Sequence, residues 1–450
     1  MHIAMIGAGY VGLVSATCFA DFGHDVVCID KDPDRLNALR QGKIPIFEPG
    51  LEDLAKSNAE AGRLRFGDDV GKAARGADIV FLAVGTPSRH GDGYADLTFV
   101  YEAARDIAPH LAGFTVVVTK STVPVGTGDE VERIIRDANP AAEFTVVSNP
   151  EFLREGSAIE DFKRPDRIIV GTDDTRAQAI MEDVYRPLGA NNTPVLFVDR
   201  RTAELTKYAS NAFLAMKITF INEMADLCER VGADVLGVAR GMGMDARIGN
   251  RFLDAGPGYG GSCFPKDSTA LTNMAQDSDS PLRLVETTVA INDQRRRAMA
   301  RKVIRACGGR VRGRRIGILG LTFKPGTDDM REAPSIPIIR TLLDAGAVIR
   351  AYDPAANAAA HHTLREIEIC DDPYDVAQDA IGLAVITEWE EFKSLDLERL
   401  GRQMDPMSNV LVDLRNMFDP AEVSKAGLTY EAVGRGNLNR ASEAIKFAAE

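Results

Sequence analysis

Gly7-Ala8-Gly9-Tyr10-Val11-Gly12 lies between a short apolar run at residues 3–6 and a helical pattern that ends at Gly23. In this setting of strand, turn and helix, a GxGxxG stretch lets a pyrophosphate approach backbone N–H groups at the positive end of the helix. Residues 25–30, Asp-Val-Val-Cys-Ile-Asp, predict a second strand with an acid at its end, Asp30, 18 positions after Gly12. The pattern therefore predicts a βαβ unit that binds a dinucleotide.

The acidic residue at the end of the second strand indicates which dinucleotide is favoured. We expect the Asp30 carboxylate to accept hydrogen bonds from the adenosine ribose hydroxyls and to repel a 2′-phosphate, which favours NAD over NADP. The alternative is a glycine turn followed by an aspartate that only caps a helix.

The amino-terminal half continues as alternating strands and helices, which predicts a parallel sheet. Further apolar runs cover residues 79–84, 115–119 and 144–148. Ligands gather at the carboxyl ends of such strands, so the polar residues that follow these runs are site candidates. These candidates are Thr86, Ser121, Thr122, Glu151 and Glu155. Each could instead cap a helix or form a turn, but Glu151 lies in a proline-restrained loop and is the stronger functional candidate.

One long helix is expected from residue 202 onward, because about 30 residues contain neither Pro nor Gly, with Thr202, Ala203 and Glu204 opening it. Apolar residues occupy several faces of its early turns, which predicts burial on most sides. Lys207 and Asn211 share one face, and a buried lysine needs a partner or a ligand. The alternative is a purely structural ion pair. A helix of this length also suits a connection between domains and a dimer interface.

Residues 256–267, Gly-Pro-Gly-Tyr-Gly-Gly-Ser-Cys-Phe-Pro-Lys-Asp, are expected to form an irregular loop, because four glycines and two prolines disfavour helix and strand. Cys263 is a potential nucleophile, and Lys266 and Asp267 place charge near it. The alternative is a turn-rich connection with an incidental thiol. If the loop binds a ligand, its glycines are expected to let that ligand approach the backbone beside the sulfur.

A second series of strands and helices begins at residues 314–321 and continues with apolar runs at 348–352, 383–386 and 410–412. Its first loop lacks GxGxxG but contains Lys324 and Arg331, which predicts a second nucleotide site with a different grip.

These elements together predict an α/β protein with two Rossmann-like doubly wound domains joined by a long central helix. We expect an NAD-binding domain at residues 1–200, a helical dimerisation region with the thiol loop at 201–300, and a second nucleotide-binding domain at 301–450.

The 450 residues carry a formal net charge of −13, which disfavours nonspecific binding to nucleic acid or to anionic membranes. The six cysteines form no CxxC pair and no zinc-ligand spacing, so we expect reduced thiols in a cytoplasmic protein without a metal site. Residues 3–20 are uncharged, but three glycines interrupt them and no basic segment precedes them. We therefore expect neither a signal peptide nor a membrane span.

Five motifs carry a resemblance to a known family. In chain order they are residues 7–12, Asn149-Pro150-Glu151-Phe152-Leu153, Lys207 with Asn211, Gly260-Gly261-Ser262-Cys263-Phe264-Pro265-Lys266-Asp267, and Phe323-Lys324-Pro325-Gly326-Thr327-Asp328-Asp329. Over about residues 1–420 the sequence resembles the UDP-glucose 6-dehydrogenase family. The resemblance implies a two-step oxidation of the C6 alcohol of UDP-glucose to the carboxylate of UDP-glucuronate, with two NAD consumed.

The resemblance also implies a covalent mechanism. Cys263 would add to the C6 aldehyde as a thiohemiacetal, which is oxidised to a thioester and then hydrolysed. Hydride transfer and hydrolysis both need acid–base groups near C6. By similarity, Lys207 and Asp267 would bracket the reacting oxygen, and Lys207 and Asn211 would stabilise the oxyanion. Glu151 would assist hydrolysis, and Thr122 would position water.

Two sets of binding residues follow from the resemblance. NAD would contact Gly7, Gly9, Tyr10, Val11, Gly12, Asp30, Thr86, Ser121, Thr122, Glu155 and Arg331. The UDP-sugar site would include Glu151, Phe152, Leu153, Lys207, Asn211, Phe252, Tyr259, Gly260 and Lys324. Arg247 matches an arginine that enters the sugar-nucleotide site of a neighbouring subunit, so a homodimer or a higher homo-oligomer is expected.

Two alternatives stay open at this point. One is the same chemistry on GDP-mannose or a UDP-N-acetylhexosamine, for which relatives typically differ around the thiol. The other is a nonenzymatic NAD-binding sensor. The presence of Cys263, Lys207, Asp267 and Glu151 together argues against the sensor, which has no need of all four.

Overall fold

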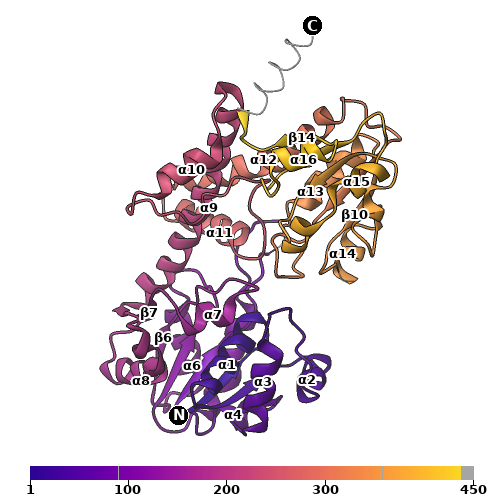
Figure 1. The fold of residues 1–450 in the computed structure, drawn as a ribbon. Helices are drawn as coiled ribbons and strands as arrows, with labels where there is room; N and C mark the ends of the chain where they lie inside the picture. The colour runs from indigo at the N-terminus through magenta and orange to yellow at the C-terminus, as the bar shows by residue number, and fades with distance from the viewer. Residues whose placement is uncertain (90, 357, 437–450) are drawn as a thin grey trace. The chain divides into compact units, whose positions relative to one another are not determined.

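The computed structural model describes residues 1–89, 91–356 and 358–436, and these form two compact units. Unit 1 comprises Met1–Ser210 with Thr269–Asp279, and unit 2 comprises Asn211–Ser268 with the residues from Ser280 onward. Each unit contains one α/β sheet, and the long helix α9 (Arg200–Val231) runs from one unit into the other (Figure 1). The predicted fold class is confirmed.

The sheet of unit 1 has eight strands in the order β3-β2-β1-β4-β5-β6-β7-β8. All neighbours are parallel except β6 and β7. The strands are β1 (His2–Ile6), β2 (Asp25–Ile29), β3 (Leu64–Gly67), β4 (Ile79–Leu82), β5 (Thr115–Thr119), β6 (Phe144–Ser148), β7 (Ile168–Gly171) and β8 (Val195–Val198). The five predicted strands are therefore confirmed, although β4 ends two residues earlier than expected.

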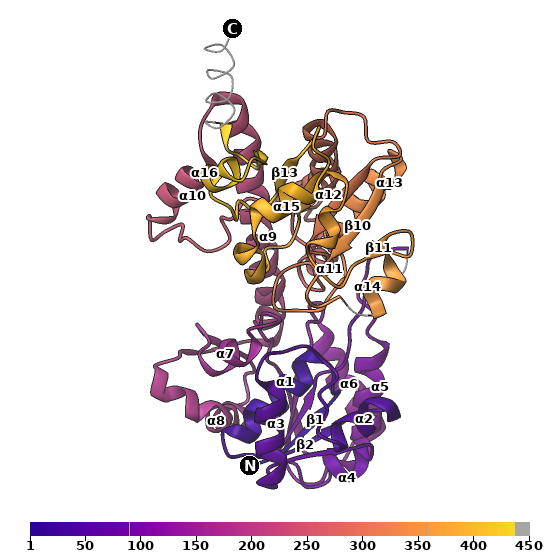
Figure 2. The same ribbon diagram turned by 45° about the vertical axis from the view of Figure 1, so that its right-hand side comes forward.

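Helices cover both faces of this sheet, as a doubly wound fold requires. They are α1 (Tyr10–Asp21), α2 (Pro33–Arg40), α3 (Leu51–Glu60), α4 (Val70–Ala74), α5 (Thr98–Ile107), α6 (Thr127–Ala138), α7 (Ala158–Lys163) and α8 (Thr175–Tyr185). One apolar core includes buried side chains of α1, α3, α7 and α8, and a second core includes those of α4, α5 and α6. Figure 2 shows α1 and α5 on opposite sides of β1 and β2.

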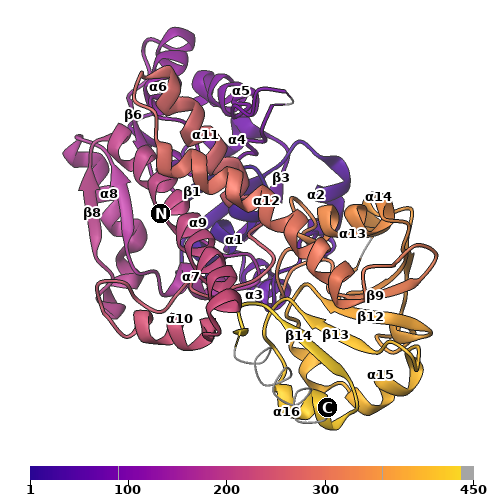
Figure 3. The ribbon, with the colours of Figure 1, turned by 90° about the horizontal axis from the view of Figure 1, so that it is seen from above.

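Unit 2 contains a six-stranded parallel sheet in the order β11-β10-β9-β12-β13-β14, part of which is visible in Figure 3. The strands are β9 (Arg315–Leu319), β10 (Val348–Tyr352), β11 (Glu368–Ile369), β12 (Ala380–Val385), β13 (Val410–Asp413) and β14 (Thr429–Ala432). This order repeats that of the first six strands of unit 1, so β9 corresponds to β1 and β10 corresponds to β2.

Helices also cover both faces of the second sheet. Buried side chains of α12 (Arg283–Ala306) and α13 (Ser335–Asp344) belong to one core, and those of α15 (Leu397–Gln403) and α16 (Pro420–Lys425) belong to the other. The remaining helices that contribute to this unit are α10 (Val235–Gly243), α11 (Phe264–Asp277, shared with unit 1) and α14 (Ala358–Thr363). Among the described residues, no helix combines the length and apolarity needed to cross a membrane.

Two expectations about α9 need correction. The helix begins at Arg200 rather than Thr202, because the Asp199 carboxylate accepts hydrogen bonds from the backbone N–H (2.9 Å) and hydroxyl (2.5 Å) of Thr202. Asp199 therefore provides the cap. The expected burial on most sides is also wrong, because Leu205 and Phe213 are 45% and 58% exposed.

The thiol segment is not a loop to its end. Helix α11 begins at Phe264, and the backbone N–H of Asp267 donates to the carbonyl oxygen of Cys263 at 2.8 Å. Pro265 is compatible with this start, because the first N–H groups of a helix have no partner within it. Cys263 therefore lies immediately before the first turn of a helix.

Candidate active site

The glycines of residues 7–12 have two different structural roles. A Cβ atom on Gly7 would lie 2.5 Å from the carbonyl oxygen of Ala83, and one on Gly12 would lie 1.9 Å from that of Gly7. These two glycines therefore allow the turn and the close packing of α1. At Gly9, by contrast, a Cβ would meet nothing within 4 Å. The space beside Gly9 is open at the N-terminus of α1, where a pyrophosphate binds in this kind of fold.

Asp30 lies directly after β2 and links this strand to the glycine turn. Its Oδ2 atom accepts hydrogen bonds from the Ala8 N–H (2.7 Å) and from Arg35 (3.1 Å), and Oδ1 accepts one from the Asp32 N–H (3.0 Å). Burial acts to raise the pKa of Asp30, but these hydrogen bonds and the Arg35 charge hold it below its ordinary value. An ionised carboxylate with lone-pair capacity left on Oδ1 fits a ribose hydroxyl donor, so the residues present suit NAD.

The hydroxyl groups after β4 and β5 join these two loops to each other. The Thr86 hydroxyl donates to the carbonyl oxygen of Thr122 at 3.0 Å, and the Ser121 hydroxyl donates to that of Val84 at 2.6 Å. Thr122 also lines a cavity of about 10 Å³ together with Lys207. A space of this size has room for roughly one water molecule.

Glu151 and Lys207 form a buried ion pair in unit 1. The Lys207 Nζ atom lies 3.1 Å from Glu151 Oε1 and donates to the Glu151 carbonyl oxygen at 2.6 Å. The second carboxylate oxygen accepts the N–H of Leu153 at 2.5 Å. Both side chains are at most 6% exposed, and the ring of Phe152 lies 5.2 Å from the ammonium. The partner that a buried lysine requires is therefore Glu151.

Glu48 is a residue that sequence reasoning missed. Its buried carboxylate accepts the N–H groups of Gly156 (2.7 Å) and Ala158 (2.8 Å) and the phenol of Tyr10. Burial, with the Glu48 hydrogen bond, raises the pKa of Tyr10, and the nearby Glu155 adds to this effect. Glu48 therefore ties the glycine turn to the segment that carries Glu151 and Glu155. Its sequence signal, an acid before Pro-Gly, is also that of an ordinary turn.

In unit 2, the cysteine at the start of α11 differs from the buried cysteines. Cys18, Cys28, Cys228 and Cys307 are buried, and burial raises the pKa of Cys18 to about 12 and that of Cys307 to about 11. Such thiols are inert at neutral pH. Cys263 is half-buried and precedes a helix N-terminus, a position that favours negative charge. No group of His, Cys, Asp and Glu that could hold a metal occurs among the described residues.

Asp267 is held by two neighbours in the first turn of α11. The Asn211 side-chain amide donates to its Oδ2 at 2.6 Å, and the Lys266 ammonium lies 2.6 Å from its Oδ1. The carboxylate is 1% exposed. Asn211, Lys266 and Asp267 thus form one polar cluster within a turn of the Cys263 carbonyl, and this cluster offers both acidic and hydrogen-bonding groups.

The cysteine segment is shaped by α12, which the sequence reasoning did not single out. Asn292 exchanges two hydrogen bonds with the backbone of Tyr259, at 2.9 and 3.1 Å, and Arg296 donates to the carbonyl oxygen of Tyr259 at 2.7 Å. Arg295 donates to that of Gly256 at 3.0 Å. The signal that could have revealed them is a run of Asn and Arg at buried positions of a helix.

The glycines of this segment allow close internal packing. A Cβ on Gly260 would lie 2.3 Å from the Glu332 carbonyl oxygen, and one on Gly261 would lie 2.7 Å from the Phe323 ring. The approach of a ligand to the backbone beside the sulfur stays a prediction.

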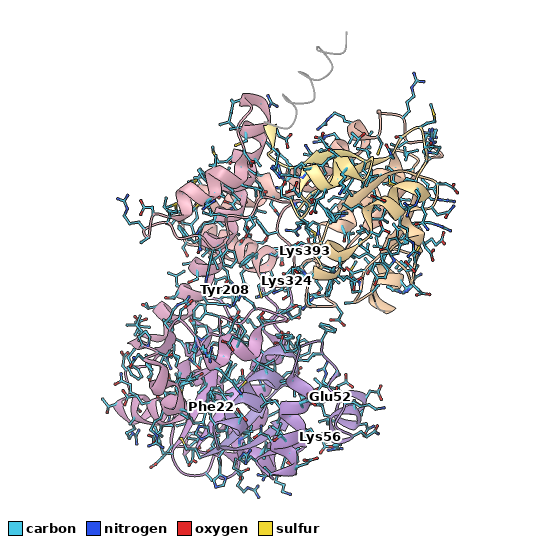
Figure 4. The ribbon with its side chains drawn as sticks, in the orientation of Figure 1. Phe22, Glu52, Lys56, Tyr208, Lys324 and Lys393 are labelled. Atoms are coloured by element: carbon cyan, nitrogen blue, oxygen red, sulfur yellow. The ribbon has the colours of Figure 1, made fainter. Side chains whose placement is uncertain are left out.

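The other expected ligand-binding residues of unit 2 lie on loops and at helix ends. Phe252 has φ +64°, a strained conformation for a bulky residue, and its ring lies 6.0 Å from that of Phe264. Lys324, labelled in Figure 4, lies 5.6 Å from the Phe323 ring. Arg331 pairs with Asp329 at 2.8 Å, while Arg247 is 89% exposed and pairs with Asp245.

Asp353 occupies the position in the second sheet that Asp30 occupies in the first, directly after β10. Its carboxylate accepts the N–H groups of Leu321 (2.7 Å) and Thr322 (3.0 Å), the indole N–H of Trp389 (3.0 Å) and the N–H of Ala355 (2.9 Å). It is 4% exposed. The Asp353 side chain is therefore bonded within its own unit and buried, whereas the Asp30 side chain is partly exposed.

The chain has two doubly wound sheets, and the first has an open glycine turn with an ionised aspartate. A thiol also lies before a helix, next to buried acid–base groups. These features are typical of a nicotinamide-dependent dehydrogenase with two nucleotide-binding domains. Family models match residues 1–189, 201–294 and 317–420, described as the NAD binding, central and UDP binding domains of the UDP-glucose/GDP-mannose dehydrogenase family. The chain belongs to this family.

Full-length relatives agree with this assignment. The chain is 63% identical over 437 residues to the UDP-glucose 6-dehydrogenase of Rhizobium meliloti (strain 1021), which covers 97% of this chain and 100% of the relative. It is 46% identical to UDP-glucose 6-dehydrogenase TuaD of Bacillus subtilis (strain 168), with 99% and 95% of the two chains covered. The structure of a UDP-glucose dehydrogenase from the archaeon Pyrobaculum islandicum matches with a TM-score of 0.88 at 38% identity, over 95% of this chain and 96% of that one.

Proposed function

We propose that the protein is an NAD-dependent UDP-glucose 6-dehydrogenase, which oxidises the C6 alcohol of UDP-glucose to the carboxylate of UDP-glucuronate. The observation that carries this proposal is the 63% identity to a UDP-glucose 6-dehydrogenase over nearly the whole of both chains. The site supports it, because a thiol, a carboxylate–amide cluster and a carboxylate–ammonium pair are the groups that this chemistry needs.

NAD, when bound, accepts the hydride in each of the two oxidations. Cys263 forms a C–S bond with the C6 aldehyde after the first oxidation, so the aldehyde does not leave the enzyme. The second oxidation converts this adduct to a thioester, and attack of water breaks the C–S bond and releases the carboxylate and the thiol. Four electrons leave the sugar, and two NAD take them.

The acid–base groups belong to the Glu151–Lys207 pair and to the cluster of Asn211, Lys266 and Asp267. In this proposal Lys207 and Asp267 handle the proton of the reacting oxygen, and Asn211 and Lys207 stabilise negative charge on it. Glu151 assists the hydrolysis, and Thr122 positions water, for which the cavity that it lines supplies room. The same proposal includes the NAD and UDP-sugar contacts that the resemblance implies. It also includes a division of the chain into three parts at residues 200 and 300.

The test is a substrate panel with product counting. Purified protein is offered UDP-glucose, GDP-mannose and UDP-N-acetylhexosamines, each with NAD or NADP, and NADH or NADPH and uronate are both measured. We expect two NADH for each UDP-glucuronate, and preference for NAD. Preference for a guanosine nucleotide or an N-acetylated sugar would reject the substrate assignment, and tight NAD binding without any turnover would favour the sensor.

We also propose that the chain forms a homodimer through unit 2. Phe213, Phe220 and Leu227 are 58%, 46% and 48% exposed and recur every seven residues along one face of α9. Further exposed apolar side chains of the same unit are Val231, Leu236, Met244 and Ile248. A soluble monomer rarely leaves such a set uncovered. The neighbouring Arg247 is 89% exposed and pairs with Asp245, and the resemblance implies that it enters the site of a second subunit.

Phe220→Glu is expected to convert the dimer to a monomer, because it places a charge within the apolar set on α9. Sedimentation velocity measures the change. Phe99→Glu is the matched control, since Phe99 is 49% exposed on α5 of unit 1 and is expected to leave the dimer intact. A monomeric native protein, or a Phe220→Glu dimer as stable as the native one, would reject this interface. The reduced thiols of the chain favour a cytoplasmic location.

A further inference from the structure

Lys120 is a buried lysine for which the mechanism above has no role. It follows β5 directly, is 4% exposed, and its Nζ atom donates to the Asn149 Oδ1 atom and to the Tyr185 phenol oxygen, both at 3.0 Å. The phenol in turn donates to Asn149 Oδ1 at 2.6 Å. Lys120, Asn149 and Tyr185 therefore form a closed triangle of hydrogen bonds, called the Lys120 triangle below.

The ammonium of the Lys120 triangle has no carboxylate partner in the described chain. Its bonds go to a neutral amide and a neutral phenol, and its other close neighbours are the rings of Phe162 (6.0 Å) and Tyr185 (5.6 Å). By contrast, the buried ammonium groups of Lys207 and Lys302 each pair with a carboxylate. A buried cation without a counter-ion is costly, so a purely structural position would be filled more economically by an apolar side chain.

The triangle is connected to the Glu151–Lys207 pair through the backbone. Asn149 is fully buried after β6, and its amide nitrogen donates to the Ile169 carbonyl oxygen at 2.7 Å. Only Pro150 separates it from Glu151. A shift of Asn149 would therefore move Glu151 and the carbonyl group to which Lys207 donates.

We propose that Lys120 is a positioning residue for the Glu151–Lys207 pair. Through its hydrogen bonds to Asn149 and Tyr185 it holds in place the backbone that leads into Glu151. It also adds a third ionisable group near the pair. This proposal deepens the proposed function and rests on it. Lys120 itself touches neither substrate nor cofactor in this assignment.

The charge of Lys120 gives the proposal a measurable pH signature. Burial lowers the pKa of Lys120 to about 7, with Glu151 acting to raise it and Lys207 to lower it further. Tyr185, whose own pKa burial raises, stays neutral in this range. Lys120 is therefore charged below about pH 7 and neutral above it. Below that pH its positive charge lies near the Glu151–Lys207 pair and disfavours further positive charge there.

Two variants separate the two parts of the role. Lys120→Met removes both the N–H donors and the charge, and Lys120→Gln removes the charge but keeps an N–H donor. We expect kcat with UDP-glucose to fall about 10-fold or more in Lys120→Met, because a displaced acid–base pair loses alignment, while KM for NAD is unchanged. Lys120→Gln is expected to recover part of the lost kcat. Lys56→Met, at an exposed position on α3 (Figure 4), is the matched control.

The pH profile of kcat is the second measurement. In both Lys120 variants the acidic limb is expected to move to higher pH, by about half a unit or more, since a neighbouring positive charge has been removed. The basic limb is expected to stay, because Lys120 is already neutral there. Lys56→Met should leave both limbs in place.

The result that would overturn the proposal is a Lys120→Met enzyme with native kcat and a native pH profile. The proposal would also be overturned if kcat falls equally in Lys120→Met and Lys120→Gln and the acidic limb of the pH profile does not move in either variant. If Lys120→Met does not fold, Lys120→Gln and Tyr185→Phe carry the test, and Tyr185→Phe is expected to lower kcat by a smaller factor. Native protein that fails to oxidise UDP-glucose rejects the proposed function instead, before any variant is compared.

Discussion

Cys263→Ser is expected to lower the steady-state formation of UDP-glucuronate by about 10³-fold or more, because the hydroxyl of serine is a far weaker nucleophile than a thiolate at neutral pH. Without the covalent adduct the second oxidation has no activated substrate. The variant should therefore release at most about one NADH per active site, as a single burst, instead of two NADH per sugar. Rapid-mixing absorbance and product chromatography measure both quantities.

Cys370→Ser is the matched control for this variant. Cys370 is also half-buried and also lies in unit 2, at the edge of the second sheet, but it has no part in the proposed chemistry. Its replacement is expected to leave the ratio of two NADH per sugar unchanged. Continuous production of two NADH per sugar by Cys263→Ser would refute covalent catalysis at this position.

Lys207→Met is expected to reduce kcat by about 10²- to 10⁴-fold, the range for losing a proton-transfer group or an oxyanion donor. It should also lower the melting temperature, because it leaves the buried Glu151 carboxylate without its partner. Breaking a buried ion pair in this way costs about 3–5 kcal/mol of stability. Steady-state kinetics and calorimetry on the same preparation measure the two effects.

The double variant Lys207→Met/Glu151→Gln separates catalysis from stability. The neutral amide removes the uncompensated charge, so the melting temperature is expected to recover while kcat stays low. Recovery of kcat together with stability would mean that Lys207 acts only by holding the fold. Full activity in the single variant would remove Lys207 from the mechanism altogether.

The expected dinucleotide site at the glycine turn, and most strands of the two sheets, were predictable because local sequence determines them. The glycine turn needs particular residues at fixed spacing, and Asp30 follows a recognisable strand. The long helix α9 was equally clear, since it contains neither Pro nor Gly after its start. The short strands β7 and β8, at one end of the first sheet, were missed because four-residue runs give little periodicity.

Residues that act through long-range contacts could not be found in this way. Glu48 reaches the backbone more than 100 positions along the chain, and Lys120 meets Tyr185 across 65 positions. Asn292 and Arg296 contact the cysteine segment from a separate helix. In each case the residue type is common, and only the folded chain reveals the partner. The same holds for the exposed apolar face of α9, which the proposed homodimer would cover.

The error at the start of α11 has a different origin. Gly and Pro were read as signs of a loop throughout residues 256–267, although proline is favoured in the first turn of a helix. Glycines up to residue 261 do belong to irregular backbone, and the helix begins three residues later. The composition of residues 256–267 takes no account of where each Gly and Pro lies. It therefore could not indicate that Cys263 immediately precedes a helix.

The matching strand orders of the two sheets raise the question of how the two nucleotide ligands of the proposed enzyme are told apart, and the aspartates after β2 and β10 differ in a way that bears on it. A protein with two similar nucleotide folds could admit the adenosine moiety at either one, and a misplaced dinucleotide would compete with the sugar nucleotide. In the second sheet the aspartate after β10 is turned inward, onto its own backbone and Trp389. Under the proposed function, this difference in exposure between Asp30 and Asp353 would favour the adenosine ribose at the first sheet over the second.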